Sequence, residues 1–191
     1  MVTSSGQSVT ILAVTTLKLL CINAFRSSAL LAYLPNKRSS LCDVREDCRT
    51  GEQKLLSVDM VLDVGRSLNP AIDIGQIEGS FMQGYGLMTN GEFTYDDNGK
   101  PIQDSMYKYK IPTAATVPRR FRVKLLKYSD TFAEQVYSSK GIGEPPLMLS
   151  VAAVASLRFA INARRRDLGF SDFIELSAPL TRAKIISFCN P

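Results

Sequence analysis

At 191 residues the chain is long enough for one domain, or for a domain with an appendage, and it can bury a sizeable core. Its composition is ordinary for a globular protein, with 45% hydrophobic and 21% charged residues, and the formal charge of +5 comes from scattered basic residues, which favours a solvated surface over nucleic-acid binding. The absence of histidine excludes a Ser/His/Asp triad, an HExxH zinc site and any histidine-based proton relay.

The cysteines show no sign of a metal site in their spacing. They form no CxxC pair and no iron–sulfur or zinc pattern, and they stand at Cys21, Cys42, Cys48 and Cys189. We therefore expect reduced thiols in an intracellular, cytoplasmic protein, and no metal-ligating residues. Proton chemistry then has to use Asp, Glu, Lys, Tyr or Cys.

Residues 1–41 differ in character from the rest of the chain. The stretch from 11 to 34 is apolar, but Lys18 and Arg26 interrupt it, so it lacks the run of about 18 residues that a membrane span needs. The start MVTSSGQSVT lacks the positive charge of a signal peptide. We expect an atypical segment, helical where ordered and without a membrane partner, then a polar linker, NKRSSLCDVREDCRTGEQ. The folded domain is expected over residues 42–191.

A regular pattern begins at Val58. It predicts a strand over residues 58–65, a loop around Asn69-Pro70, and a helix over residues 74–88 with Asp73 as N-cap. The helix holds several glycines, each lowering helix propensity by up to ~1 kcal/mol relative to Ala. They stand at Gly75, Gly79, Gly84 and Gly86. This content predicts that a sheet, another helix or a ligand approaches the helix backbone closely.

Three further stretches have the character of strands. EFTYDDNGKPI predicts a hairpin that turns at Asp97-Asn98-Gly99, and residues 107–111 alternate like a strand that ends at Pro112. RRFRVKLLKY alternates apolar and basic residues, as expected for an antiparallel sheet with one solvated face. EQVYSSKGIG predicts a short strand that runs into a glycine turn.

Two helices are predicted to complete the chain. Residues 147–167 form an apolar helix after Pro145-Pro146, with basic residues 164–166 at its negative end. Residues 177–189 form a closing helix, with Ser177 as cap and Pro179 in the first turn. Because strands and helices mix without regular βαβ alternation, we expect an α+β fold: a mixed, layered sheet-and-helix domain with an atypical N-terminal segment.

Glu144 is the first candidate for chemistry. It stands in KGIGEPPLML, between a glycine-rich turn and the proline pair that opens a helix, where the helix dipole favours the ionised carboxylate by about 0.3–1 kcal/mol. The glycines allow a ligand to approach, so the carboxylate is a candidate general base. The alternative is that Glu144 only caps the helix or satisfies nearby N–H groups.

Gln76 is the second candidate. In AIDIGQIEG it lies three residues after Asp73, which is the spacing of a capping box. The alternative is an amide presented to a ligand at a helix start. A nucleotide fold is rejected, because neither KGIGEPPL nor GQIEGSFMQGYG has the glycine order of a phosphate-binding loop.

Taken together, three stretches resemble the C-terminal, second molybdopterin-binding domain of the xanthine dehydrogenase and aldehyde oxidase family. They are VDMVLDVGRSLNPAIDIGQIEGSFMQGYGL, YKIPTAATVPRRFRVKLL and SSKGIGEPPLMLSVAAVASLRFAINARRRDLG. The resemblance covers roughly residues 42–191 in one collinear order, and residues 1–41 match no part of the family. NPAIDIGQIEG and SSKGIGEPPL carry the specificity.

The resemblance implies a role for each matching residue. Glu144 matches the glutamate of the family's G-E-P-P motif, which is the family's general base. In the family this base takes the proton of a molybdenum-bound hydroxyl while the oxygen attacks the substrate and hydride passes to a sulfido ligand. The substrates are N-heterocycles, such as xanthine or hypoxanthine, or aldehydes. Gln76 matches the glutamine that lies against the pterin. Ser139 and Lys140 belong to the cofactor-facing loop, and Gly143 packs near the metal.

Family members are usually longer chains. They carry two 2Fe–2S domains, a flavin domain with FAD, and two molybdenum-binding regions, of which this sequence matches only the last. The resemblance therefore implies that this chain supplies the base and one wall of a molybdopterin site, and that missing family domains or a homodimer partner supply the rest. Three hypotheses follow: a catalytic fragment or subunit, a truncated remnant that keeps the fold without activity, and an unrelated binding module whose basic strand binds an acidic partner.

Overall fold

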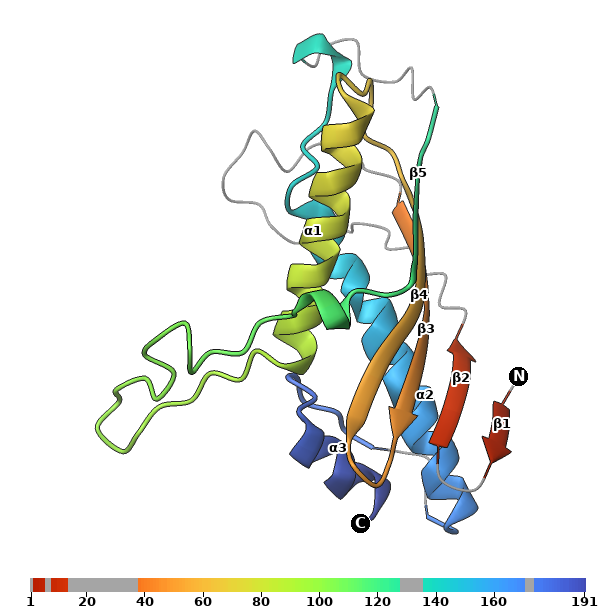
Figure 1. Ribbon diagram of the computed structural model, residues 1–191, viewed down its shortest axis with the longest axis vertical. Helices are drawn as coiled ribbons and strands as arrows, with labels where there is room; N and C mark the ends of the chain where they lie inside the picture. Colours follow the sequence, from red (N-terminus) through yellow and green to blue (C-terminus); the bar gives the residue numbers. More distant parts are fainter. Residues whose placement is uncertain (1, 6–7, 14–37, 128–135, 171–173) are drawn as a thin grey trace.

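The computed structural model describes residues 2–5, 8–13, 38–127, 136–170 and 174–191 (Figure 1). Within these residues one five-stranded sheet has the strand order β1-β2-β3-β4-β5. Adjacent strands are antiparallel, except that β4 and β5 are parallel. The strands are β1 (Val2–Ser5), β2 (Ser8–Ala13), β3 (Arg38–Asp47), β4 (Glu52–Leu62) and β5 (Arg120–Leu125). Together with three α-helices they confirm the predicted α+β class.

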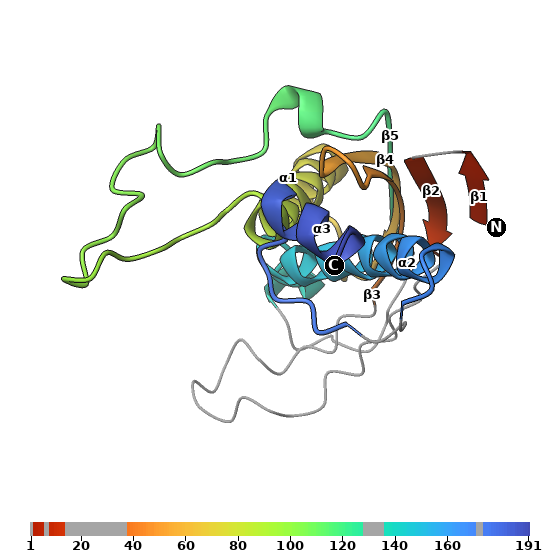
Figure 2. The same cartoon turned by 90° about the horizontal axis from the view of Figure 1, so that it is seen from below.

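The helices lie against one face of the sheet, which curves around them (Figure 2). They are α1 (Pro70–Thr89), α2 (Val151–Asp167), which continues the 3-10 helix η3 (Pro145–Ser150), and α3 (Arg182–Cys189). The core between the layers is apolar. Its largest fully buried side chains include Met60 and Val58 from the sheet, Ile77 and Phe81 from α1, and Leu157 and Ile161 from α2.

The β3–β4 hairpin occupies the segment that we predicted to be a polar linker, so that prediction is wrong. Ser40, Cys42, Val44 and Glu46 alternate along β3 and are all buried, which gives the charge-rich stretch one inward face. β3 also crosses position 41/42, where we expected the domain to start. The predicted helical character of residues 1–41 is wrong for β1 and β2, and residues 14–37 lie outside the described residues.

Helix α1 begins at Pro70, one turn before the predicted start. Asn69 is the N-cap, and its side-chain oxygen accepts a hydrogen bond from the Ala71 N–H at 3.2 Å. Asparagine before proline is a stronger start signal than Asp73, which lies in the first turn and accepts from Ser67 Oγ at 2.6 Å. Residues 63–69 connect the end of β4 to the start of α1.

β4, α1 and β5 form one crossover unit. The alternation predicted for residues 120–125 is confirmed, because Phe121, Val123 and Leu125 are turned toward the core while the basic residues between them are exposed. The predicted antiparallel pairing is wrong, since β5 runs parallel to β4. Parallel neighbours need a long crossover connection, and here α1 and the residues after it return the chain to the end of the sheet where β4 began.

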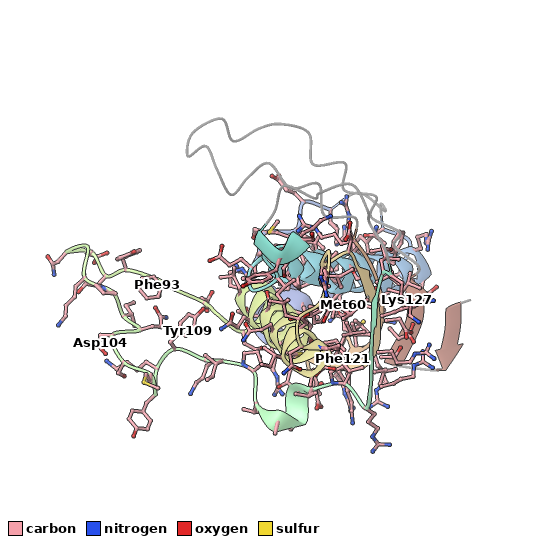
Figure 3. The ribbon with its side chains drawn as sticks, turned by 90° about the horizontal axis from the view of Figure 1, so that it is seen from above. Met60, Phe93, Asp104, Tyr109, Phe121 and Lys127 are labelled. Atoms are coloured by element: carbon pink, nitrogen blue, oxygen red, sulfur yellow. The ribbon has the colours of Figure 1, made fainter. Side chains whose placement is uncertain are left out.

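Residues 92–112 form an arm that extends away from the body (Figures 1 and 3). Its predicted turn is confirmed: the Gly99 N–H donates to the Asp96 carbonyl at 2.9 Å, and Gly99 has φ +77°. The predicted strand over residues 107–111 is wrong. The N–H groups of Lys108 and Tyr109 both donate to the Ser105 carbonyl, because no strand among the described residues lies alongside to pair with them.

The segment Pro145–Asp167 is, among the described residues, long and apolar enough to cross a membrane. More than half of its most apolar window is buried inside the protein, as in the core helix of a globular domain. The predicted cations in its last turn, residues 164–166, are confirmed. The closing helix starts only at Arg182, not near Ser177 or Pro179, because the Leu180 N–H donates to the Met88 carbonyl at 2.8 Å and holds the chain extended.

Candidate functional site

The loop of residues 138–144 is tied to the end of β4 by backbone hydrogen bonds. The Arg66 N–H donates to the Ser138 carbonyl at 2.8 Å, and the Lys140 N–H donates to the Val64 carbonyl at 3.0 Å. Ser139 forms an isolated antiparallel bridge with Gly65. The predicted strand in this region is thus reduced to one bridge after the short 3-10 helix η2 (Val136–Ser138).

Lys140 and Asp63 reinforce this attachment with a buried ion pair. Lys140 Nζ lies 2.6 Å from Asp63 Oδ2, and the two side chains are only 1% and 2% exposed. The Gly65 N–H also donates to Asp63 Oδ1 at 2.9 Å. A charge-assisted pair that is so well shielded from water holds the loop in one position.

The backbone just before the loop is strained. Tyr137 and Ser138 have φ values of 53° and 56°, a left-handed conformation that is unfavourable for residues with side chains. Two consecutive residues of this kind cost on the order of 1–3 kcal/mol each and persist only where surrounding contacts impose them. The hydrogen bond to the Ser138 carbonyl and the Lys140–Asp63 pair are such contacts.

Glu144 is the N-cap residue of η3, and its side chain is exposed. Its carbonyl accepts from the Leu147 N–H at 3.0 Å, but its carboxylate makes no cap hydrogen bond within the described part of the chain. The capping explanation for this residue is therefore wrong. The acid is presented on the surface of a loop whose backbone is fixed.

Gln76 lies on the exposed side of α1 beside that loop. A methyl group built on Gly143 would lie 3.9 Å from Gln76 Oε1, so the structure brings these two predicted site residues together. The capping-box explanation is wrong, because the Asp73 N–H already donates to the Asn69 carbonyl at 3.0 Å. The amide is exposed and close to the glycine loop.

The glycines of α1 divide into two groups. Gly84 is in close contact with η3, since a methyl group there would overlap the Leu147 carbonyl. Gly75 and Gly79, on the exposed side, face open space among the described residues, as does Gly141 in the loop. The predicted close approach is therefore confirmed at Gly84, while the glycines around Gln76 leave backbone uncovered.

Comparison with known proteins gives this arrangement a family. The family model of the molybdopterin cofactor-binding domain matches residues 29–118, starting ahead of position 42. A probable aldehyde oxidase of Caenorhabditis elegans is 49% identical over 146 residues, covering 75% of this chain, and a xanthine dehydrogenase of Drosophila subobscura is 45% identical over 147 residues, covering 77%. The chain belongs to the xanthine dehydrogenase and aldehyde oxidase family.

This family member spans 12% and 11% of the length of those two relatives. Among solved structures it is similar to quinoline 2-oxidoreductase from Pseudomonas putida 86, with a TM-score of 0.70, 25% identity, and coverage of 81% of this chain and 18% of that one. It shares its fold with the aldehyde oxidoreductase of Desulfovibrio gigas, with a TM-score of 0.64 and 19% identity over 82% of this chain and 16% of that one.

Within this xanthine dehydrogenase and aldehyde oxidase domain, Asp63 is the site residue that sequence reasoning missed. Its position at the end of a largely apolar strand, VDMVLDVG, was the available signal. Burial of a carboxylate at this position costs free energy unless the carboxylate pairs with a cation. Its partner, Lys140, lies 77 residues away in the sequence, so the pair became visible only in the folded chain.

The basic strand of the family domain is neutralised by neighbouring acids. Arg122 forms an ion pair with Asp59, and Arg120 lies 3.4 Å from Asp59 and 3.7 Å from Asp43. The hydrogen bond from Arg122 is the main reason that the pKa of Asp59 lies below its ordinary value. Two of the three basic residues of β5 are therefore compensated by acids of the neighbouring strands, which disfavours a module for acidic partners.

Proposed function

We propose that this chain forms one wall of a molybdenum-cofactor site, with Glu144 as general base, in an enzyme that oxidises N-heterocycles of the xanthine or hypoxanthine type or aldehydes. One observation carries the proposal. The Glu144 carboxylate is exposed, makes no cap hydrogen bond within the described residues, and follows directly on Gly143, which lies beside the Gln76 amide. A general base needs a carboxylate that can reach the proton it accepts, and the exposed side chain of Glu144 meets this requirement.

The residues present fit a flat, polar cofactor. A methyl group on Gly75 or Gly79 would meet nothing among the described residues, so a ligand can approach the α1 backbone there, and Gln76 adds an exposed side chain with both donor and acceptor groups. When bound, the molybdenum cofactor supplies the activated oxygen and accepts the electrons of the oxidation. Gln76 would hold the pterin, and Gly143 would allow the loop to approach the metal.

The roles of the loop residues follow from their contacts. Glu144 accepts a proton at its carboxylate oxygen and later releases it to solvent. Lys140 uses its ammonium for Asp63, so we assign it a positioning role, in which it fixes the loop that carries Glu144. Ser139, bridged to Gly65, fixes the same loop.

Other protein regions would complete the enzyme. The remaining wall of the cofactor site, FAD and the 2Fe–2S centres would come from further family domains or from a homodimer partner, and the small-molecule substrate would bind between the walls. The alternative is a remnant that keeps this fold without turnover. Glu144, Gln76 and the buried pair are in place, as the catalytic proposal requires, and measurement of turnover separates the two alternatives.

The test is reconstitution of the site. The full chain is expressed with the missing family regions supplied in trans, and bound molybdenum, pterin, and oxidation of xanthine or an aldehyde with an artificial electron acceptor are measured. We expect Glu144→Gln to lower turnover by about 10²-fold or more with unchanged cofactor content, because an amide cannot accept the proton. Glu52→Gln, at an exposed glutamate at the other end of β4, is the matched control.

Two outcomes would contradict the proposal. Absence of metal, pterin and activity in the reconstituted protein would remove the catalytic role and support the remnant. Undiminished turnover of the Glu144→Gln variant, with cofactor bound, would leave the cofactor site in place but remove Glu144 from the base role.

A further inference from the structure

A second group of reactive side chains lies at the other end of β4, where the β3–β4 turn meets α3 and the end of α2 (Figure 1). Glu46 stands on β3, Cys48 follows it in the turn, and Cys189 is the last residue of α3. Their exposed fractions are 0%, 3% and 0%. Since β4 has 11 residues, roughly 30 Å separates this cluster from the loop that carries Glu144.

The three side chains point at a common centre. One carboxylate oxygen of Glu46 and the two Sγ atoms all lie within 4.8 Å of one another, and Cys189 Sγ is 3.4 Å from Glu46 Oε1. In a tetrahedral zinc site, Zn–S bonds of about 2.3 Å and Zn–O bonds of about 2.0–2.2 Å place the ligand atoms roughly 3.5–3.8 Å apart. Shifts of about 1 Å or less would complete this geometry.

An independent observation shows that the cluster lacks a partner. The second carboxylate oxygen of Glu46, Oε2, is fully buried and has no hydrogen-bond partner among the described residues. An orphaned carboxylate oxygen in the core is costly, and a bound cation would satisfy it. The guanidinium of Arg164 lies close enough to Cys48 to act on the charge of its thiol.

The charge of the cluster indicates which valence a bound cation would need. One carboxylate and two thiolates carry a charge of −3, and the Arg164 guanidinium contributes +1, so a divalent cation makes the buried cluster neutral. Thiolate ligands select zinc over the hard cations magnesium and calcium. An adjoining cavity of about 270 Å³, lined by Cys48, Arg49, Arg164 and Asn190, provides an entry path and room for a water molecule as fourth ligand.

We propose that Glu46, Cys48 and Cys189 bind one zinc ion, which fastens α3 to the β3–β4 hairpin. The spacing of the cysteines predicted no metal site, because Cys189 is separated from Glu46 by 143 positions and only the fold brings the ligands together. Zinc binding displaces the ligand protons and stabilises the folded chain over the unfolded one.

The test uses the full chain, reduced and freed of metal. Zinc is titrated against a chelating dye, and cobalt is titrated by absorbance, since cobalt bound by thiolates gives charge-transfer bands. We expect roughly one ion per chain, and an affinity lowered by ~100-fold or more in Glu46→Gln and in Cys189→Ser, because each replaces an anionic ligand by a neutral one and should cost more than the roughly 10–100-fold of a change outside the ligand set. Cys42→Ala removes a buried thiol outside the cluster and is the matched control.

Alkylation followed by mass spectrometry gives a second readout. Bound zinc should protect Cys48 and Cys189 while leaving the labelling of Cys42 unchanged. The proposal is overturned if the wild type binds zinc no better than Glu46→Gln, if cobalt gives no thiolate bands, or if Cys42→Ala loses as much affinity as Cys189→Ser. Should Cys189→Ser fail to fold by circular dichroism, the nearly isosteric Glu46→Gln decides.

Discussion

The ammonium of Lys140 and the carboxylate of Asp63 are almost completely shielded from water, with 2.6 Å between Nζ and Oδ2. Removing one partner leaves the other as a buried, uncompensated charge. We predict that Lys140→Met lowers the free energy of unfolding by about 3–5 kcal/mol, measured by urea denaturation of the full chain. The double variant Lys140→Met/Asp63→Asn should recover much of this loss, because asparagine still accepts from the Gly65 N–H. A loss below about 1 kcal/mol in the single variant would contradict this account.

Residue identities at the candidate site could be predicted from sequence, but their surroundings could not. The motifs around Glu144 and Gln76 identified both residues, while spacing alone left a capping role open for each. That choice depended on single hydrogen bonds, such as the Asp73 N–H to the Asn69 carbonyl. The Asp63–Lys140 pair and the Glu46 cluster stayed hidden, because their members are far apart in the chain.

At the scale of elements, two glycines of α1 make a matched pair. A methyl group at Gly84 would overlap the Leu147 carbonyl of η3, whereas one at Gly79 meets nothing among the described residues. We predict that Gly84→Ala destabilises the chain by about 1–3 kcal/mol through overpacking. Gly79→Ala should stabilise it by up to about 1 kcal/mol through helix propensity. Urea denaturation measures both, and equal effects would show that α1 and η3 are not in close contact.

The pairing of β5 with β4 carries a pH dependence through Asp59. Its pKa is lowered chiefly by the hydrogen bond from Arg122, with burial opposing and the charges of Arg122 and Arg120 assisting. A lowered pKa stabilises the folded state above the ordinary aspartate range and loses that effect as the pH falls. We predict that Asp59→Asn costs at most about 1 kcal/mol at pH 7, because the arginines are largely exposed.

The measurement is urea denaturation, in which no added salt screens the pair. The difference between Asp59→Asn and the wild type should begin to shrink as the pH falls toward the ordinary aspartate pKa of about 3.9, where the unfolded chain takes up the proton, and it should vanish below the lowered pKa of the folded state. A difference that stays constant over this range would assign the effect of the substitution to packing instead.

Helices and strands with one apolar face could be predicted from sequence. Strands whose formation or direction is decided by contacts with other elements could not. The alternation in β5 and the apolar run of α2 gave correct elements. β3 was missed, because its buried positions include Ser40 and Glu46, which look like linker residues in isolation. The direction of β5 was missed because it is set by the crossover through α1 rather than by its own side chains.

For the whole molecule, the arm of residues 92–112 stands apart from the core. Met106 and Tyr107 at its outer end are 89% and 91% exposed, so they add little to the stability of the body. We predict that replacing residues 94–108 by a short Gly/Ser linker changes the free energy of unfolding by less than about 0.5 kcal/mol. Urea denaturation and the near-ultraviolet circular dichroism of the remaining tyrosines check this. Loss of cooperative unfolding would show that the arm belongs to the core.

The parallel pairing of β5 with β4 also sets the order in which the molecule can assemble. β3 and β4 are joined by a tight turn and can pair early. β5 can pair with β4, as at Leu62 and Leu125, only after α1 and the arm between these two strands have been synthesised. The loop with Glu144 comes later still, and its hydrogen bonds at Val64 and Arg66 need the end of β4 already in place. In a nascent chain the β3–β4 pairing can therefore form before the loop that carries Glu144, and the candidate catalytic residue is among the last to reach its position.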